Sequence, residues 1–251
     1  MLTTAETCVD AGMHVHIDKP AGSSLSHFKR VLDKAAAKHL AVQMGYMYRY
    51  NPGVVLLREM LQKGWLGEPF EVHAVMSKVV PPANRKQLAE FPGGMMFELS
   101  CHLIDSIVKI LGKPDEVTPF NQHAADVDDT LRDNMLAVFT YPKAIASVKT
   151  AAMEVEGFRR RHLVLCGTEG TFHIQPLDRP AVQLSLSKAR GKYAKGFQEV
   201  ELPNYVRYID DVADLAKIIR MEKDNDFSYE HDLAVQETVL RASGVGLEPD
   251  V

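Results

Sequence analysis

Apolar residues recur along parts of the chain with the 3.6-residue period of a helix and alternate in others. The clearest helical stretch runs from Gly93 to Leu111, where apolar side chains surround most of the circumference. One narrow polar line remains within it, because Glu98, His102, Asp105 and Lys109 follow one another at helical spacing. The pattern predicts a largely buried helix with ionisable side chains along one face.

Two interpretations of this polar line are open, since a charged group in an apolar setting must be paired, hydrated or used in a site. In the first, the line faces solvent, and Glu98 and His102 form an ordinary pair one turn apart that contributes a few tenths of a kcal/mol. In the second, it lines a cleft, where Glu98 holds His102 as a general base. The helix alone favours the first, because ion pairs are commonly structural.

The first 45 residues have the pattern of one βαβ unit, in which the two strands lie parallel. Because the chain opens inside a helix that feeds this unit, we expect a sheet whose earlier strands are absent. The expected elements are a helix over 1–12 closed by Gly12, a strand over 13–17, a helix over 23–40 and a strand over 41–45.

From residue 46 onward, short alternating stretches joined by hairpin-length turns predict a largely antiparallel sheet. The central helix is expected to pack its apolar faces on this sheet and to present its polar line at an edge. The expected elements are a turn at 48–52, a helix at 53–63, a strand at 70–79, a polar loop at 81–92, strands at about 115–124, 133–141, 143–153, 161–167, 171–176, 181–187 and 197–202, and helices at 205–221 and 229–243.

Composition excludes several classes of protein. The chain of 251 residues is 46% hydrophobic, enough for a globular core, and its formal net charge of −4 gives no overall attraction to nucleic acid or anionic membrane. The one basic run, Arg159 to Arg161, is interpreted as a solvated strand start. Cys8, Cys101 and Cys166 are widely spaced, so neither a disulfide framework nor a zinc site is indicated and no metal is expected. With no apolar run of about 20 residues and no leader, we expect a soluble, cytoplasmic protein.

A lysine follows the first predicted strand directly, in the sequence Asp18-Lys19-Pro20. The carboxyl ends of strands in open parallel sheets are where ligands bind. Lys-Pro after a strand is commonly just a turn with a hydrated lysine, so this feature alone does not establish a site.

Combined with the central helix, it resembles the Gfo/Idh/MocA family of nicotinamide-dependent oxidoreductases. The resemblance rests on HVHIDKP before a helix, YRYNP, GWLGEP and PGGMMFELSCHLID, in that order. Lys19-Pro20 matches the family's K-P, with Asp18 in place of glutamate. The family's D-x-G-x-H-x-x-D is matched with Glu for the first Asp and Ser for the Gly, by Glu98, Ser100, His102 and Asp105.

The resemblance implies roles for single residues. Lys19 would contact both the nicotinamide ribose and the reacting hydroxyl, with Pro20 beside it, and His102 would be the acid–base group that Glu98 assists by orienting substrate or imidazole. Hydride removal from a carbinol requires the hydroxyl proton to leave to a group that titrates near neutrality, which His102 supplies. Lys19 would stabilise the developing oxygen charge. The expected substrate contacts are Asp105, Tyr48 and Arg49.

The resemblance also implies a fold and a function. Residues 1–45 would be a remnant of a Rossmann NAD(P)-binding domain, and 46–251 an α/β domain with an open, mostly antiparallel sheet that mediates homo-oligomers. No G-x-G-x-x-G occurs. The chain is therefore expected to lack most of the nucleotide-binding half and to bind NAD or NADP at millimolar affinity or weaker.

Three functions follow from these expectations. The first is the catalytic and substrate-binding half of a sugar or polyol dehydrogenase. The second is a non-catalytic binding or dimerisation module, and the third is an unrelated α+β domain that matches the motifs by chance. Retention of both Lys19 and His102 favours the first.

Overall fold

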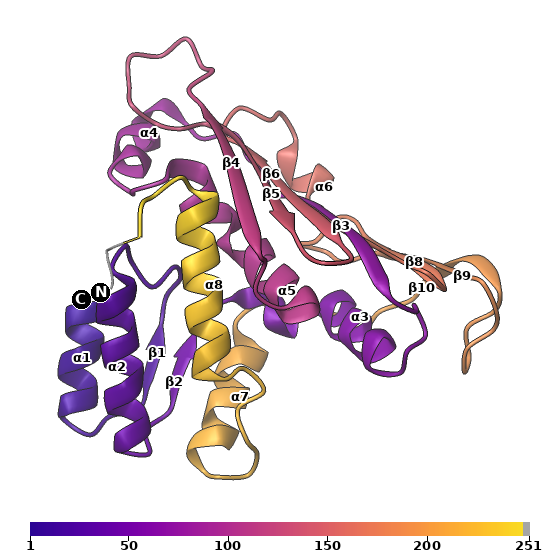
Figure 1. The fold of residues 1–251 in the computed structure, drawn as a ribbon, viewed down its shortest axis with the longest axis horizontal. Coiled ribbons are helices and arrows are strands. Elements are labelled where there is room, and N and C mark those ends of the chain that lie inside the picture. The colour runs from indigo at the N-terminus through magenta and orange to yellow at the C-terminus, as the bar shows by residue number, and fades with distance from the viewer. Residues whose placement is uncertain (248–251) are drawn as a thin grey trace.

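Two β-sheets form the frame of the structure, a computed structural model that describes residues 1–247 (Figure 1). The smaller sheet pairs β1 (Val15–Ile17) with β2 (Val42–Met44) in parallel. Helices α1 (Leu2–Asp10) and α2 (Leu25–Ala37) lie beside it, and the predicted parallel βαβ unit is confirmed. The Ser24 side chain caps α2 by accepting a hydrogen bond from the backbone N–H of His27.

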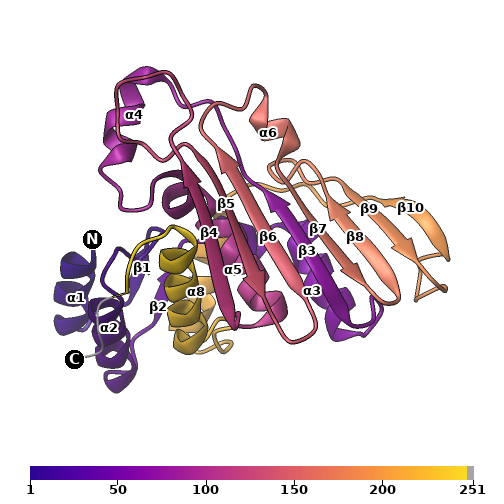
Figure 2. The same cartoon turned by 45° about the horizontal axis from the view of Figure 1, so that its top comes forward.

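The larger sheet has eight strands in the order β10-β9-β8-β7-β3-β6-β5-β4 (Figure 2). Every neighbouring pair is antiparallel except β3 and β6, so the predicted mostly antiparallel sheet is confirmed. The strands are β3 (Pro69–Val75), β4 (Glu116–Gln122), β5 (Asn134–Thr140), β6 (Ile145–Ala151), β7 (His162–Gly167), β8 (Gly170–Ile174), β9 (Val182–Leu186) and β10 (Gly196–Val200).

Strand β3 lies in the interior of this sheet, although it is the first of the eight in sequence. On one side Glu71 pairs with Ile145 of β6, and on the other Glu71 pairs with Cys166 of β7. Both neighbours therefore come from much later parts of the chain. Its inward residues Val72 and Ala74 are fully buried, as expected for a strand in the middle of a sheet.

Helices α3 (Pro52–Gln62) and α5 (Cys101–Leu111) lie behind the large sheet in Figure 2, whereas no helix crosses its other face there. Asn51 begins α3, because its side chain accepts hydrogen bonds from the backbone N–H groups of the first turn and Pro52 follows it. Helix α8 (Tyr229–Ala242) packs against α2, α5 and β4 and so connects the two sheets. Helix α7 (Ile209–Ile219) comes directly before α8 in the chain.

A helix, α4 (Pro82–Ala89), occupies the segment where a polar loop was predicted. The polar composition of this segment does not exclude a helix, because Ala, Gln, Lys and Arg are all good helix formers and a proline is well placed in a first turn. Arg85 of this helix is buried and pairs with Asp129 and Asp133, at 2.5 and 2.8 Å. These partners lie more than 40 residues away, so local sequence could not indicate them.

The middle of the polar line of the central helix is buried, whereas Lys109 at its end is exposed. His102 and Asp105 are buried, with 4% and 1% of their surface exposed, and α5 contacts α8 and the turn η1 (Met47–Tyr50) on this side. The turn before α5, η2 (Met96–Ser100), is π-helical. A π turn is wider than an α turn, so Glu98 is shifted out of the expected register with His102.

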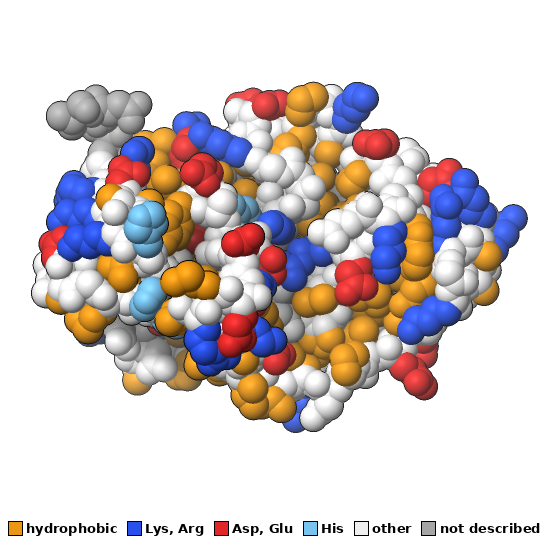
Figure 3. All heavy atoms as spheres, turned by 90° about the horizontal axis from the view of Figure 1, so that it is seen from below, with side chains coloured by type: hydrophobic (Ala, Val, Ile, Leu, Met, Phe, Trp, Pro, Cys, Tyr) orange, Lys and Arg blue, Asp and Glu red, His pale blue; other side chains and the backbone are white. Residues whose placement is uncertain are grey.

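Charged side chains of both signs are interspersed on the face shown in Figure 3. Among the helices of residues 1–247, none is long and apolar enough to cross a membrane. A short helix, α6 (Gly157–Arg160), follows β6 and lies near the end of the large sheet (Figure 1).

Candidate active site

A cavity of about 220 Å³ brings together segments from most of the chain. It is bounded by the turn after β1, the end of β2, the segment after β3, the η2–α5 junction, α6 and the loop before α7. Lys19 and His102, which are distant in sequence, both line it. The full lining is Asp18, Lys19, Gly45, Met47, Met76, Lys78, Leu99, His102, Phe158, Arg161, Arg207 and Tyr208.

Lys19 reaches the cavity because it directly follows β1. Its Nζ donates to the backbone oxygen of Glu98 at 2.7 Å and lies 3.4 Å from the carboxylate Oε1 of the same residue. Burial works against the charge on this ammonium, but the negative groups around it, including Glu98 and Asp18, raise its pKa above the ordinary value. Lys19 is therefore a protonated donor at neutral pH.

Glu98 lies between two lysines rather than beside the imidazole. Its Oε1 faces Lys19 and its Oε2 lies 3.3 Å from Nζ of Lys78. Among the described residues, no hydrogen bond joins Glu98 to His102, so no contact supports orientation of the imidazole by this carboxylate, and orientation of the substrate stays a prediction. The π-helical turn changes the angle between the two side chains.

His102 is the buried titratable group of the cavity. Its Nδ1 has no hydrogen-bond partner among residues 1–247, and its ring centroid lies 6.0 Å from that of Tyr46 and 5.5 Å from that of Tyr48. Burial, followed by the positive charges of Lys19 and the nearby arginines, holds the pKa of His102 well below its usual value. The imidazole is therefore neutral at pH 7 and able to accept a proton.

This lowered pKa predicts a loss of stability in acid. The unfolded chain protonates His102 near pH 6.5, whereas the folded chain protonates it only at a clearly lower pH. Stability from this residue is thus fully present above pH 6.5 and declines below it, by up to about 1.4 kcal/mol per pH unit, until the folded pKa is reached. Urea unfolding of the wild type and His102→Gln between pH 8 and 5 measures it: the wild type should lose more stability on acidification, and equal losses would contradict the prediction.

Two arginines of the cavity lining, Arg161 and Arg207, and their shared partner Asp178 were not identified as site residues from the sequence. Asp178 accepts hydrogen bonds from Arg161 at 3.1 Å, from Arg207, and from the hydroxyl of Tyr48 at 3.1 Å. The interpretation of Arg161 as part of a solvated strand start is wrong, because only 3% of its side chain is exposed. Asp178 and Arg207 lie in loops, where no periodic pattern marks them. Tyr48 stands behind the cavity wall.

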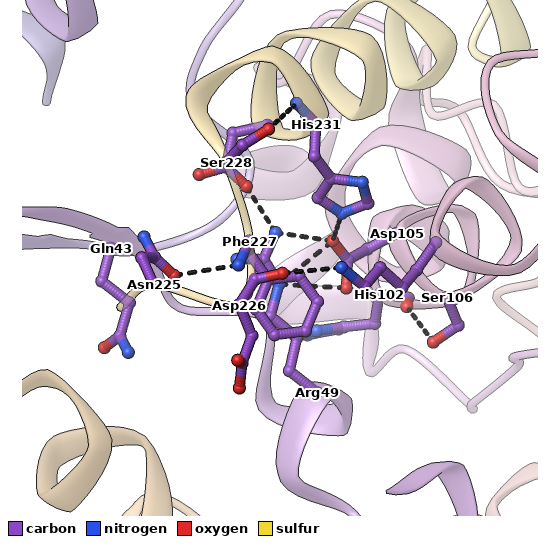
Figure 4. A network of polar contacts seen from close by, with 12 residues as sticks. Gln43, Arg49, His102, Asp105, Ser106, Asn225, Asp226, Phe227, Ser228 and His231 are labelled. Atoms are coloured by element: carbon purple, nitrogen blue, oxygen red, sulfur yellow. Dashed lines mark hydrogen bonds and ion pairs between the residues drawn. The ribbon is translucent and has the colours of Figure 1, made fainter. Parts of the chain in front are cut away.

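Arg49 and Asp105 do not line the cavity, although direct substrate contact was expected of both. Arg49 is fully buried and donates to Asp105 at 2.6 Å, and Nε2 of His231 lies 3.0 Å from Asp105 (Figure 4). Arg49 also donates to Asp232 at 2.5 Å. The ring of Phe227 lies 4.0 Å from the Arg49 guanidinium. Asp105, His231 and Asp232 could together hold a metal ion. The guanidinium already supplies the cation that these carboxylates require.

Pro20 follows Lys19 at a buried position outside the cavity lining. Gly45, which directly follows β2, does line the cavity. A Cβ on Gly45 would come within 3.1 Å of Nε2 of His16 and 3.2 Å of the Ile17 backbone oxygen. The absence of a side chain here keeps the ends of β1 and β2 close together beside Lys19.

Comparison with known proteins places this arrangement in a family. Residues 54–173 match the model of the GFO/IDH/MocA C-terminal domain. The uncharacterised oxidoreductase YhhX of Escherichia coli is 24% identical over 214 residues, an alignment that covers 82% of this chain and 58% of YhhX. Inositol 2-dehydrogenase 1 of Saccharopolyspora erythraea is 36% identical over 72 residues, 28% of this chain and 21% of that protein.

Solved structures share the fold across nearly the whole chain. UDP-N-acetylglucosamine 3-dehydrogenase GnnA from Acidithiobacillus ferrooxidans superposes with a TM-score of 0.80 at 18% identity, over 97% of this chain and 73% of that one. An NAD binding oxidoreductase from Klebsiella pneumoniae superposes with a TM-score of 0.82 at 16% identity, over 97% and 74%. At these identities the likeness concerns the fold alone.

Residues 54–173 therefore form a C-terminal domain of the Gfo/Idh/MocA family. The chain spans 58% of YhhX and 30% of an uncharacterised oxidoreductase from Schizosaccharomyces pombe, to which it is 29% identical over 112 residues.

Proposed function

We propose that this chain carries the catalytic and substrate-binding part of an NAD- or NADP-dependent dehydrogenase that acts on a sugar or polyol. The observation that supports it most directly is the meeting of a protonated lysine, Lys19, and a neutral histidine, His102, in one cavity. The relatives' names support the substrate class, since they include inositol 2-dehydrogenase and D-xylose 1-dehydrogenase. In this proposal residues 1–45 are part of a nucleotide-binding unit and 46–251 the substrate domain.

The chemistry in this proposal divides between the two side chains. Oxidation of an alcohol removes the hydroxyl proton and a hydride from the same carbon, and the oxygen becomes a carbonyl. The His102 imidazole accepts the proton, which is possible because the ring is neutral and Nδ1 has no protein partner. The Lys19 ammonium donates a hydrogen bond to the substrate oxygen and stabilises the negative charge that develops there. In the reverse direction His102 returns the proton.

In this proposal, the remaining residues position or contact Lys19 and His102. Glu98 holds Lys19 through the carboxylate and the backbone oxygen, and so fixes the position of the ammonium. Arg49 and Asp105 position α5, from which His102 projects, rather than touching the substrate. Tyr48 contacts the imidazole from behind and donates to Asp178.

In this proposal the nicotinamide end of a dinucleotide binds beside the substrate, next to Lys19. Lys19 offers a charged donor in the cavity lining, and Gly45, which also lines the cavity, has no side chain. Lys19 and Pro20 would hold this end of the cofactor. A nicotinamide bound there supplies the hydride acceptor.

Loss of the Lys19 charge tests the proposal. With NAD and NADP and a panel that includes myo-inositol and D-xylose, Lys19→Met is expected to lower kcat/KM by about 10²-fold, because one charged donor to the developing oxyanion is lost. Lys29→Met, a change of a lysine that is 61% exposed and pairs with Asp33, is the matched control and should have no effect. Equal activity of Lys19→Met and wild type would refute the role of Lys19.

The alternative, a binding or dimerisation module, is supported by the open face of the large sheet. Phe120 of β4, Ile145 of β6 and Phe197 of β10 are each more than half exposed. Such exposed apolar side chains on a sheet commonly mark an interface. We propose that this face forms a homo-oligomer in either case. A chain that assembles but shows no turnover with any substrate or cofactor would favour the module over the enzyme.

A further inference from the structure

The cavity contains more positive charge than acid–base chemistry requires. Lys19, Lys78, Arg161 and Arg207 all line it. Within the lining given by the described residues, Asp18 is the one carboxylate. Lys19 has a part in the proposed reaction, but the three other cations have none.

The carboxylates behind the lining do not neutralise these four cations. Glu98 is shared between Lys19 and Lys78, and Asp178 is shared between the two arginines. With Asp18, three negative charges face four positive ones. A cation that shares its counter-ion retains the capacity to bind a second anion.

Contacts with three neighbouring residues fix the orientation of the Arg161 guanidinium. Its Nε donates to the Ser77 backbone oxygen at 3.1 Å, its Nη1 donates to Asp178, and the Phe158 ring lies 3.8 Å from the guanidinium carbon. Its side chain is 3% exposed although it lines the cavity. A buried charge that is already oriented loses little entropy when it binds a ligand.

The positive charges of the cavity also lower the pKa of His102. After burial, the largest contribution to its lowered pKa is Lys19, and Arg161 and Arg207 also lower it. An anion bound between the arginines and the imidazole would reduce this repulsion.

We propose that the substrate carries an anionic group, a carboxylate or a phosphate, near the hydroxyl that reacts, and that Arg161 and Arg207 bind this group. The inference rests on the proposed function and narrows its substrate class from neutral polyols to polyol or sugar acids and phosphates. The cavity volume of about 220 Å³ is below the usual range for drug-sized ligands, about 300–1,000 Å³, so a single small sugar-like molecule is the appropriate scale.

Three matched probes test the inference by isothermal titration of the 251-residue chain, with and without NAD or NADP. Sorbitol is neutral, gluconate adds a carboxylate and sorbitol 6-phosphate adds a phosphate to the same carbon chain. At least one anionic probe is expected to bind about 10- to 100-fold more tightly than sorbitol, the scale of one charge-assisted hydrogen bond. The preferred anion distinguishes a carboxylate from a phosphate substrate.

Variants locate the binding site. Arg207→Gln should remove most of the preference for the anion, and because 32% of the Arg207 side chain is exposed, the change should leave the fold intact. Arg161→Gln should do the same where it folds. Arg159→Gln is the matched control, since this arginine is 86% exposed and pairs with Glu156 outside the cavity.

Three results would overturn the inference: sorbitol binding as tightly as both anions, an anion preference that survives Arg207→Gln, or no binding of either anionic probe. None of them bears on the proposed function, which is measured separately by the turnover of His102 and Lys19 variants.

Discussion

Replacing His102 by alanine is expected to lower turnover by about 10²- to 10⁴-fold, the usual scale for the loss of a general acid–base group. The imidazole is neutral, buried and without a partner on Nδ1, so a proton acceptor is lost and no hydrogen bond at that nitrogen is broken. The effect should appear in kcat more than in KM, because the proton moves in the transition state rather than on binding.

Steady-state kinetics with the best substrate and cofactor measure this loss, alongside thermal unfolding to show that the variant is folded. His73→Ala is the matched control, because His73 lies in β3 with its Nδ1 2.8 Å from Ser147 Oγ, outside the cavity lining. Added imidazole should restore part of the turnover of His102→Ala, since the removed ring leaves room for it. A loss of less than about 10-fold would assign the proton transfer to another group.

The largest loss of stability is expected from Arg49→Met. The change leaves Asp105 and Asp232 buried without their cation, which typically costs about 3–5 kcal/mol. Burial by itself would raise the pKa of Asp105, but Arg49 and the hydrogen bond from His231 hold it at about 2. Asp232 already has a pKa raised by burial, and its Oδ2 has no partner among the described residues. Without Arg49, both carboxyl groups would have to take up protons or admit water.

Urea unfolding at pH 7 gives the free energy of unfolding for this comparison. Arg30→Met, a change of an arginine that is 54% exposed, should shift it by less than about 0.5 kcal/mol. The triple change Arg49→Met, Asp105→Leu and Asp232→Leu should recover much of the loss, because an apolar cluster replaces uncompensated charges. If Arg49→Met alone costs less than about 1 kcal/mol, the network is hydrated and contributes little to stability.

Local patterns predicted the elements well where one face of each is buried. The alternation in NMLAVFTY is that of β5, whose residues Met135, Ala137 and Phe139 point into the core. The helix at 82–89 has no such stripe, because Arg85 is its one buried residue and is held by ion pairs. A pattern of apolar residues cannot reveal an element that is fixed by charge.

The residues of the candidate site also fall into two groups, those that a local motif marks and those that no local pattern marks. Lys19 and His102 stand in short motifs, so both could be selected from the sequence as candidates, and both line the cavity. Asp178 and Arg207 lie in loops and acquire their positions only when distant strands assemble. Arg49 was recognised as important, but its partner Asp232 is 183 residues away, so the nature of its contacts could not be inferred.

The position of β3 inside the large sheet has a consequence for synthesis on the ribosome. Its partners, β6 and β7, are completed only at Gly167, whereas β3 itself ends at Val75. At about 5–20 residues per second, the nascent strand waits roughly 5 to 20 seconds with both edges unpaired. An unpaired strand edge is a template for pairing with other chains. The chain is therefore most prone to aggregate during translation. Slower growth of the expression host, or chaperones that shield nascent chains, should raise the yield of the protein.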